Sequence, residues 1–372
     1  MLPDDAQLIS VDDHIIEHPG VWQDRLPARF KEDGPKVVYE DGIPIWWYAG
    51  KRYQPLGLDA VAGDDPQQFK LDPKAFEDMR PGCLDPKARL ADMDEDGVHA
   101  SLAFPQFPRF AGQTFLEGGE RDLALACVQA WNDFVLDEWC ATDPNRLIPL
   151  SIVPLWDPEA AAAEIRRTAA KGSRAITFSE NPAALGLPSY WTKHWDPMFS
   201  ALEETGNVLC LHVGSSSRPL IPHGEATTAL IISLMGVLTQ SVLADLVFSE
   251  VFNDHPRLKV ALSEGGIGWV PYMLERLEQV WEKHRFHSTV NMQKSPTECF
   301  RDNVWSCFIR DEAGLEARHR IGVDKIMWEA DYPHSDCLWP NSRKHLAHQL
   351  HDVPDDEARL IAGGNAKALF RL

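Results

Sequence analysis

Cysteine is sparse in this sequence, and its spacing suits neither a metal site nor a redox site. The seven cysteines among the 372 residues are scattered, and none belongs to a C-x-x-C pair. An odd, scattered set argues against a disulfide framework and against a thiolate zinc site. We therefore predict reduced, mostly buried thiols in a cytoplasmic protein.

Positive charge is also scarce. The chain has 36 Lys and Arg against 56 Asp and Glu, which gives a formal net charge of -20. A field of this sign repels phosphate backbones and anionic membrane surfaces. Nucleic acid and membranes are therefore excluded as expected partners, and a small molecule is the expected ligand.

A secretory signal and a long apolar run are missing as well. The first residues, MLPDDAQ, are acidic where a secretory signal would carry positive charge. No uninterrupted apolar stretch reaches the roughly 18 residues that a membrane-spanning helix needs. We therefore expect no membrane-spanning segment.

What the chain does contain is a regular alternation of short apolar runs with amphipathic stretches. Eight runs stand out: ISVDDHII, ASLAFP, LIPLSIVP, RAITFS, NVLCLHV, LKVALSE, VWSCFI and KIMWEADYP. Apolar runs that alternate with helical stretches are typical of parallel strands buried on both faces. We predict the α/β class, a single (β/α)8 TIM-type barrel over residues 1–372. A doubly wound sheet is the alternative, but no G-x-G-x-x-G turn follows the first run.

Residues 20–85 interrupt this alternation. The segment is rich in Pro, Gly, Trp and Tyr, as in DGIPIWWYAGKRY, and it lacks a regular period. Such composition indicates hairpins and loops. We predict an irregular insertion after the first strand that covers the mouth of the barrel.

Charged residues gather where four of the predicted strands end. They are Asp12, His14 and Glu17 after the first strand, His212 after the fifth, Glu264 after the sixth, and Asp331, His334 and Asp336 after the eighth. Barrel enzymes place their chemistry at the carboxyl ends of strands. Asp12 and His14 are two residues apart, so their side chains share one face of the strand and can bind one ion. Imidazole and carboxylate donors suit Zn(II), Mn(II) or Fe(II).

Together these features resemble the amidohydrolase superfamily. The D-x-H of the first strand, the fifth-strand His followed by V-G, the EGGIG turn and the DYPH sequence are similar to its amidohydrolase-2 branch, which includes aminocarboxymuconate semialdehyde decarboxylase and resorcylate-type decarboxylases. The resemblance implies a barrel with one metal ion bound by Asp12, His14, His212 and Asp331. Glu264 departs from the family pattern, because many members have a catalytic histidine there.

The resulting site prediction has three parts. The predicted metal ligands are Asp12, His14, His212 and Asp331, with Glu17 and Glu264 as further candidates. The predicted catalytic residues are Asp331, Glu264 and His334, and the predicted substrate contacts are Arg109, Ser215 and Trp47. Arg109 is chosen because a guanidinium binds a carboxylate in bidentate fashion. Glu17 could instead pair with Arg25 or orient a ligand through a hydrogen bond.

Two reactions fit one zinc or manganese ion at this site. Metal-activated water with Asp331 as base would hydrolyse an amide, ester or lactone. Non-oxidative decarboxylation of a small aromatic or enoic acid, which the resemblance implies, would use the same aspartate as an acid. The extra carboxylates leave a two-metal, iron-dependent oxygenase as an alternative, and a catalytically silent barrel subunit as a further one. We also expect a homo-oligomer.

Overall fold

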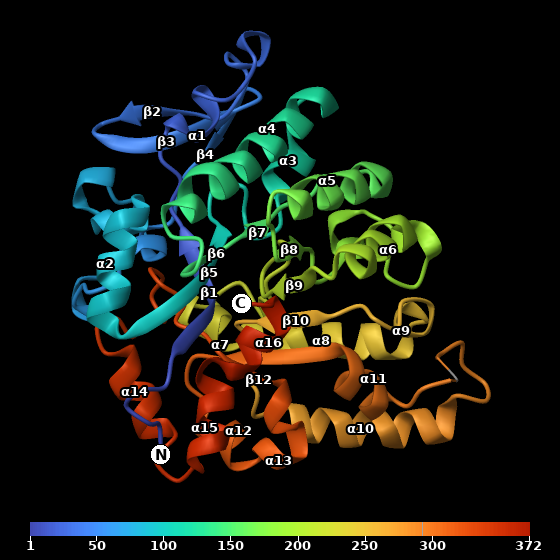
Figure 1. Ribbon diagram of the computed structural model, residues 1–372. Coiled ribbons are helices and arrows are strands. Elements are labelled where there is room, and N and C mark those ends of the chain that lie inside the picture. The colour runs from blue at the N-terminus through green and yellow to red at the C-terminus, as the bar shows by residue number, and fades with distance from the viewer. Residues whose placement is uncertain (292) are drawn as a thin grey trace.

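A ring of parallel strands forms the centre of the protein, and helices surround it (Figure 1). The computed structural model describes residues 1–291 and 293–372. The strands of the ring are β1 (Leu8–Ile15), β5 (Val98–Pro105), β6 (Leu147–Ile148), β7 (Leu150–Ser151), β8 (Ala175–Phe178), β9 (Val208–His212), β10 (Val260–Ser263), β11 (Val304–Phe308) and β12 (Ile326–Trp328). The order β1-β5-β6 and the order β12-β11-β10-β9-β8-β7 account for all of them.

Two seams join these sheets. Strands β6 and β7 are consecutive and are separated only by Pro149, which has no N–H to donate to the ladder, although its carbonyl accepts a bond of 2.9 Å from Arg174 N. At the other seam, Asp331 N donates to Asp12 O at 2.7 Å and His14 N donates to Tyr332 O at 2.6 Å. These bonds place the residues that follow β12 beside β1. The predicted barrel fold is confirmed.

The helices begin and end where local sequence signals place them. Helix α2 follows Asp85, whose side chain accepts a bond from Ala88 N, and it ends at Gly97 with a positive φ of 75°. Helix α5 likewise follows the capping side chain of Asp157. The helices are α1 (Gly20–Gln23), α2 (Pro86–Asp96), α3 (Gln113–Glu117), α4 (Arg121–Phe134), α5 (Pro158–Ala170), α6 (Asp196–Thr205), α7 (Thr228–Ser233), α8 (Met235–Phe248), α9 (Val251–Asp254), α10 (Val270–His284), α11 (Pro296–Asn303), α12 (Glu312–Glu316), α13 (Arg318–Ile321), α14 (Ser342–Gln349), α15 (Asp355–Arg359) and α16 (Asn365–Phe370).

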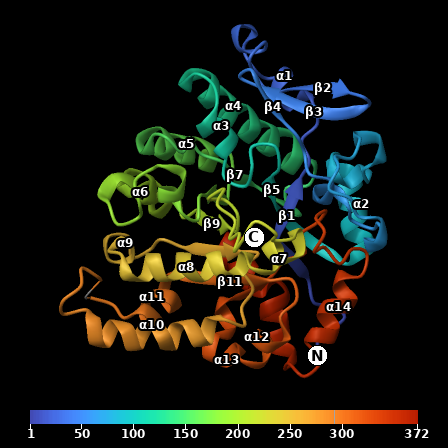
Figure 2. The ribbon, with the colours of Figure 1, turned by 180° about the vertical axis from the view of Figure 1, so that it is seen from behind.

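The insertion at 20–85 is more regular than a hairpin and loops. It contains a three-stranded antiparallel sheet of β2 (Lys36–Glu40), β3 (Ile43–Tyr48) and β4 (Lys51–Tyr53), followed by short 3-10 turns. Figure 2, turned by 180°, shows this sheet at one edge of the molecule, beyond β1 and α4. A small apolar cluster that includes Ile16, Ala60 and Tyr332 attaches the insertion to the ring.

One apolar stretch resembles a membrane-spanning helix in length and composition. Residues 228–248 have a mean hydropathy of 1.9 and are, by length and composition alone, apolar enough to cross one. The structure divides this stretch between α7 and α8 at Leu234. The inner face of α8 packs on the ring through Val242, Leu243 and Leu246, while only 28% of the stretch is buried.

Candidate metal centre

Strand β1 carries two polar side chains into the interior at its carboxyl end. All eight residues of β1 are buried, and Asp12 and His14 are both 0% exposed. Asp13, between them, points to the other side, where it accepts a bond of 2.8 Å from Ser10 Oγ and lies 3.7 Å from Arg89. Because side chains alternate along the strand, Asp13 faces hydrogen-bond partners outside the ring, whereas Asp12 faces its interior.

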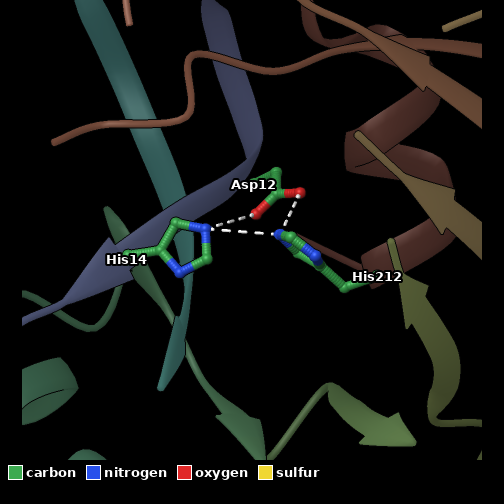
Figure 3. A group of neighbouring side chains, drawn as sticks. All are labelled: Asp12, His14 and His212. Carbon is green, nitrogen blue, oxygen red and sulfur yellow. Dashed lines mark hydrogen bonds and ion pairs between the residues drawn. The ribbon is translucent and has the colours of Figure 1, made fainter. Parts of the chain in front are cut away.

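His212, the last residue of β9, and Asp331, just after β12, complete a compact group with these two residues. His14 Nε2 lies 3.3 Å from His212 Nε2, 3.3 Å from an Asp331 oxygen and 3.5 Å from an Asp12 oxygen. His212 Nε2 is 3.3 Å from the second Asp12 oxygen. Figure 3 shows Asp12, His14 and His212 pointing toward one another. Ligands at about 2.0–2.1 Å from a tetrahedral ion are about 3.3 Å apart, so these spacings fit one divalent cation.

Burial without partners supports the same conclusion. Both carboxylate oxygens of Asp12 and Oδ2 of Asp331 are buried and accept no hydrogen bond from the described residues, and Oδ1 of Asp331 faces only the rings of His14 and His334. Burial raises the pKa of the Asp12 carboxyl well above its ordinary value, and the charge of Asp331 raises it further. Burial of unpaired charge costs several kcal/mol per group, roughly, unless a cation compensates. The group therefore fits a metal ion by its chemistry as well as by its spacing.

The two histidines are held with Nε2 toward the centre. His212 Nδ1 lies 2.6 Å from the Val213 carbonyl, to which it can donate, and this bond leaves Nε2 free to act as a ligand. Phe110 lies against the His212 ring at 4.1 Å between centroids, and Phe104 lies edge-on at 4.9 Å. Burial, with the neighbouring His334 and His212, lowers the pKa of His14 well below its ordinary value, so His14 is neutral and able to bind a metal.

His334 stands beside this group and contacts its aspartate. Its Nδ1 lies 2.9 Å from an Asp331 oxygen, and its Nε2 lies 3.0 Å from Gln106 Oε1. Its ring stacks on His14 at 3.7 Å between centroids. Burial lowers the pKa of His334 to about 4, so the ring is neutral at pH 7. The contact of 2.9 Å places His334 Nδ1 to donate to Asp331.

Two glutamates enlarge the acidic group, and one of them was missed by the sequence analysis. Glu264 lies 3.6 Å from His212 Nε2 and has a positive φ of 58°, a strained conformation for this residue. Glu329 is 0% exposed and accepts two bonds of 3.2 Å from Glu264 N. Glu329 was overlooked because it stood inside the predicted run KIMWEADYP, although its position two residues before Asp331 puts it on the same face.

Glu17 does not lie with the metal group, which corrects the prediction of a ligand there. Its carboxylate accepts bonds from Gln106 N at 3.1 Å, Phe107 N at 2.8 Å and Trp131 Nε1 at 2.9 Å. Both oxygens are therefore engaged by N–H donors. Arg25, the alternative partner, instead pairs with Glu138. Burial raises the pKa of Glu17 to about 7.

The three residues predicted to contact substrate, Arg109, Ser215 and Trp47, lie in different environments. Arg109 pairs with Glu117 and donates to Ser217 Oγ at 2.9 Å. Ser215 is fully buried and donates to the His212 carbonyl at 2.6 Å, which gives it a structural role. Trp47 donates weakly to Glu40, and its neighbour Trp46 faces the cavity instead. The structure thus corrects the predictions for Ser215 and Trp47.

Two cavities flank the centre. One, of about 560 Å3, is bordered by Glu264 and Glu329 and by Ile232, Met235 and Arg310. The other, of about 400 Å3, lies between the insertion and the loop after β5, and its lining includes Gln106, the partner of His334, and Arg109. The four proposed ligands are themselves at most 1% exposed. The cavities therefore reach the neighbours of the four ligands, Glu264 on one side and Gln106 on the other, rather than the ligands themselves.

Comparison with known proteins gives a family match over nearly the whole chain. A family model described as Amidohydrolase matches residues 21–372. A gamma-resorcylate decarboxylase of Polaromonas sp. is 26% identical over 332 residues, which are 80% of this chain and 91% of that protein. A 2-amino-3-carboxymuconate-6-semialdehyde decarboxylase of Dictyostelium discoideum is 25% identical over 311 residues, 80% of each chain.

A solved structure agrees in fold. The 5-carboxyvanillate decarboxylase of Novosphingobium aromaticivorans, complexed with manganese and 4-hydroxy-3-methoxy-5-nitrobenzoic acid, is 20% identical with a TM-score of 0.69. The similarity covers 99% of this chain and 97% of that one. At this identity the likeness concerns the fold.

Proposed function

The chain belongs to the amidohydrolase family and is an enzyme, and from this membership we propose that it catalyses the metal-dependent, non-oxidative decarboxylation of a small aromatic or enoic acid. The observation that carries the proposal is the buried convergence of Asp12, His14, His212 and Asp331 on one point. The decarboxylases among the relatives support the reaction class.

One divalent ion would be held by these four side chains and would draw electron density from a carboxylate and a neighbouring oxygen of the substrate. We propose manganese or zinc. The manganese in the 5-carboxyvanillate decarboxylase supports the first, and the tetrahedral spacing of two imidazoles and two carboxylates supports either.

The chain's own contribution to the chemistry is a placed proton. Asp331 and His334 face each other at 2.9 Å, and Gln106 holds the far nitrogen of His334 at 3.0 Å. Burial raises the pKa of the Asp331 carboxyl well above its ordinary value in the metal-free protein. In the loaded enzyme, the contact between His334 Nδ1 and Asp331 is proposed to deliver a proton to the substrate carbon as CO2 departs. Glu264, which borders the larger cavity, is proposed to contact the substrate on entry.

The reaction is tested with manganese-loaded protein in D2O and a panel of 2-hydroxybenzoates and enoic acids. We expect CO2 release and one deuterium at the carbon that lost the carboxylate. Asp331→Asn should keep metal but lose at least about 100-fold in rate, because an acid contributes roughly that factor. Asp356→Asn, at an exposed aspartate of α15 that lines neither cavity beside the centre, is the matched control.

Other results would select the alternatives. Hydrolysis of amides or lactones without CO2 would identify a hydrolase, with Asp331 as base. Two bound irons by mass spectrometry would favour the oxygenase, for which Glu264 and Glu329 supply further carboxylates. No bound metal and no turnover would leave the silent barrel.

We further propose a homo-oligomer in the cytoplasm. Leu220, Ile221 and Val237 are 40%, 55% and 39% exposed, and Met235 of the same segment lines the larger cavity. Exposed apolar surface of this kind is typical of association sites. Light scattering should give a dimer or larger species, and an active monomer would contradict this. Buried free thiols support the reducing compartment.

A further inference from the structure

The opposite end of the barrel has a cavity of its own. It has a volume of about 510 Å3 and is bordered by Ile9 of β1, Ala100 of β5 and Leu147 of β6. These residues lie near the amino ends of their strands, whereas the metal group lies at the carboxyl ends. In Figure 1 the C-terminus and α16 lie over the centre of the ring, and the cavity reaches Lys367 and Arg371 in this part of the chain.

The charged side chains that line this cavity are all of one sign. Lys171, Arg174, Lys367 and Arg371 border it together with His99, and its lining contains no Asp or Glu. Leu372 also borders the cavity. Such a concentration of cations is unexpected in a chain of net charge -20.

Most of these cations lack a compensating charge. Lys171 is paired with Asp133 and Asp137, but Arg371 donates only to neutral oxygens, those of Thr205 and Asn207. Lys367 donates to the neutral amide of Gln7. Arg174 has no side-chain partner among the described residues, and its charge, added to burial, lowers the pKa of Arg371.

Like charges that share a cavity repel one another, and the repulsion is relieved when an anion binds between them. Two guanidinium groups offer paired N–H donors that match the oxygens of a phosphate group. We propose that this cavity binds a small molecule bearing a phosphate group, at a site separate from the metal centre. The site is independent of the proposed decarboxylation.

The test is calorimetric titration of the full-length, metal-loaded protein with inorganic phosphate and with pyrophosphate, at constant ionic strength set with chloride. We expect saturable binding, tighter for pyrophosphate. Arg174→Gln and Arg371→Gln should each weaken it at least about tenfold without changing the metal content. The matched control is Arg166→Gln, which removes an exposed arginine of α5 that is paired with Glu204 outside the cavity.

The outcomes are separable from those at the metal centre. Phosphate that binds no better than chloride would overturn the proposal. Binding that persists in the Arg174→Gln, Arg371→Gln double variant would place the anion elsewhere, at the metal ion above all, and would overturn it too. Loss of binding in the double variant with unchanged manganese occupancy would support it, whatever the reaction proves to be.

Discussion

The two ends of one barrel carry opposite charges, and each end holds charges that the chain alone does not neutralise. At the carboxyl ends of the strands, four carboxylates lie around two histidines, and no Lys or Arg of the described residues lies within 4.0 Å of Asp12 or Asp331. At the amino ends, Arg174, Lys367 and Arg371 border a cavity without an acidic side chain. Strand β1 joins the two, since Ile9 and His14 are about 17 Å apart at the usual rise per residue.

The difference between the ends lies in burial. The four proposed ligands of the acidic end are at most 1% exposed, so unpaired charge there is costly and a bound ion is expected to stabilise the fold. The basic end is partly open, because Arg174 is half-buried and Lys367 and Arg371 are exposed. Water screens part of the repulsion there. Binding of the metal should therefore raise the free energy of unfolding strongly, and binding of the proposed anion should raise it only weakly.

Loss of a metal ligand should have the largest effect. His212→Ala removes one of the two imidazole donors, so we expect loss of the metal and at least a roughly thousand-fold loss of turnover, while the fold persists. Metal content by mass spectrometry, activity and circular dichroism provide the measurements. Full metal occupancy in this variant would contradict the assignment of the acidic end.

Metal removal should destabilise the protein more as the pH rises. Burial raises the pKa of Asp12, Asp331, Glu264 and Glu329 in the metal-free folded state, so that state binds more protons than the unfolded chain. Its stability must therefore fall as pH rises above the ordinary carboxylate range near pH 4. Chemical denaturation with and without chelator should show a gap of at least about 3 kcal/mol at pH 8 and a smaller gap at pH 5. An equal gap at both values would argue against an acidic, metal-neutralised centre.

Glu17 offers a contrast within the acidic end, because N–H donors rather than a metal surround it. Its pKa of about 7 exceeds the unfolded value of 4.5, so folding takes up a proton and the free energy of unfolding declines between pH 4.5 and pH 7. The decline is about 3 kcal/mol. Glu17→Gln should remove it without loss of metal. Loss of metal from the Glu17→Gln variant would instead indicate that Glu17 is a metal ligand.

The smallest effect is expected at the basic end. Arg174→Gln should raise the free energy of unfolding by about 0.5 kcal/mol in dilute, phosphate-free buffer, because it relieves repulsion from Arg371. Added phosphate should stabilise the unchanged protein more than this variant. Arg166→Gln serves again as the control, and a destabilised Arg174→Gln protein in phosphate-free buffer would mean that Arg174 stabilises the fold without an anion.

Much of the site could be predicted because it depends on strand periodicity. Asp12 and His14 share a face because they are two residues apart, and His212 and Asp331 follow from the rule that functional groups occupy strand ends. Glu17 could not be assigned in this way, since it lies two residues past β1, where no period fixes the direction of a side chain. The prediction for Trp47 was wrong for a related reason. The register of β3 in the insertion sheet decides that Trp46, and not Trp47, faces the cavity, and the composition of the segment does not reveal this register.

The sequence by itself determined the alternation of strands and helices, and with it the barrel and the end of the barrel where the acidic side chains gather, because local periodicity and apolar runs encode both. Only the tertiary structure decided which carboxylates meet. The donors of Asp12, His212 and Asp331 come from strands separated by more than a hundred residues each, and their distances depend on how the ring closes. The basic cavity was invisible in the sequence for the same reason, since its cations come from a loop and from the last helix, and only packing brings them together.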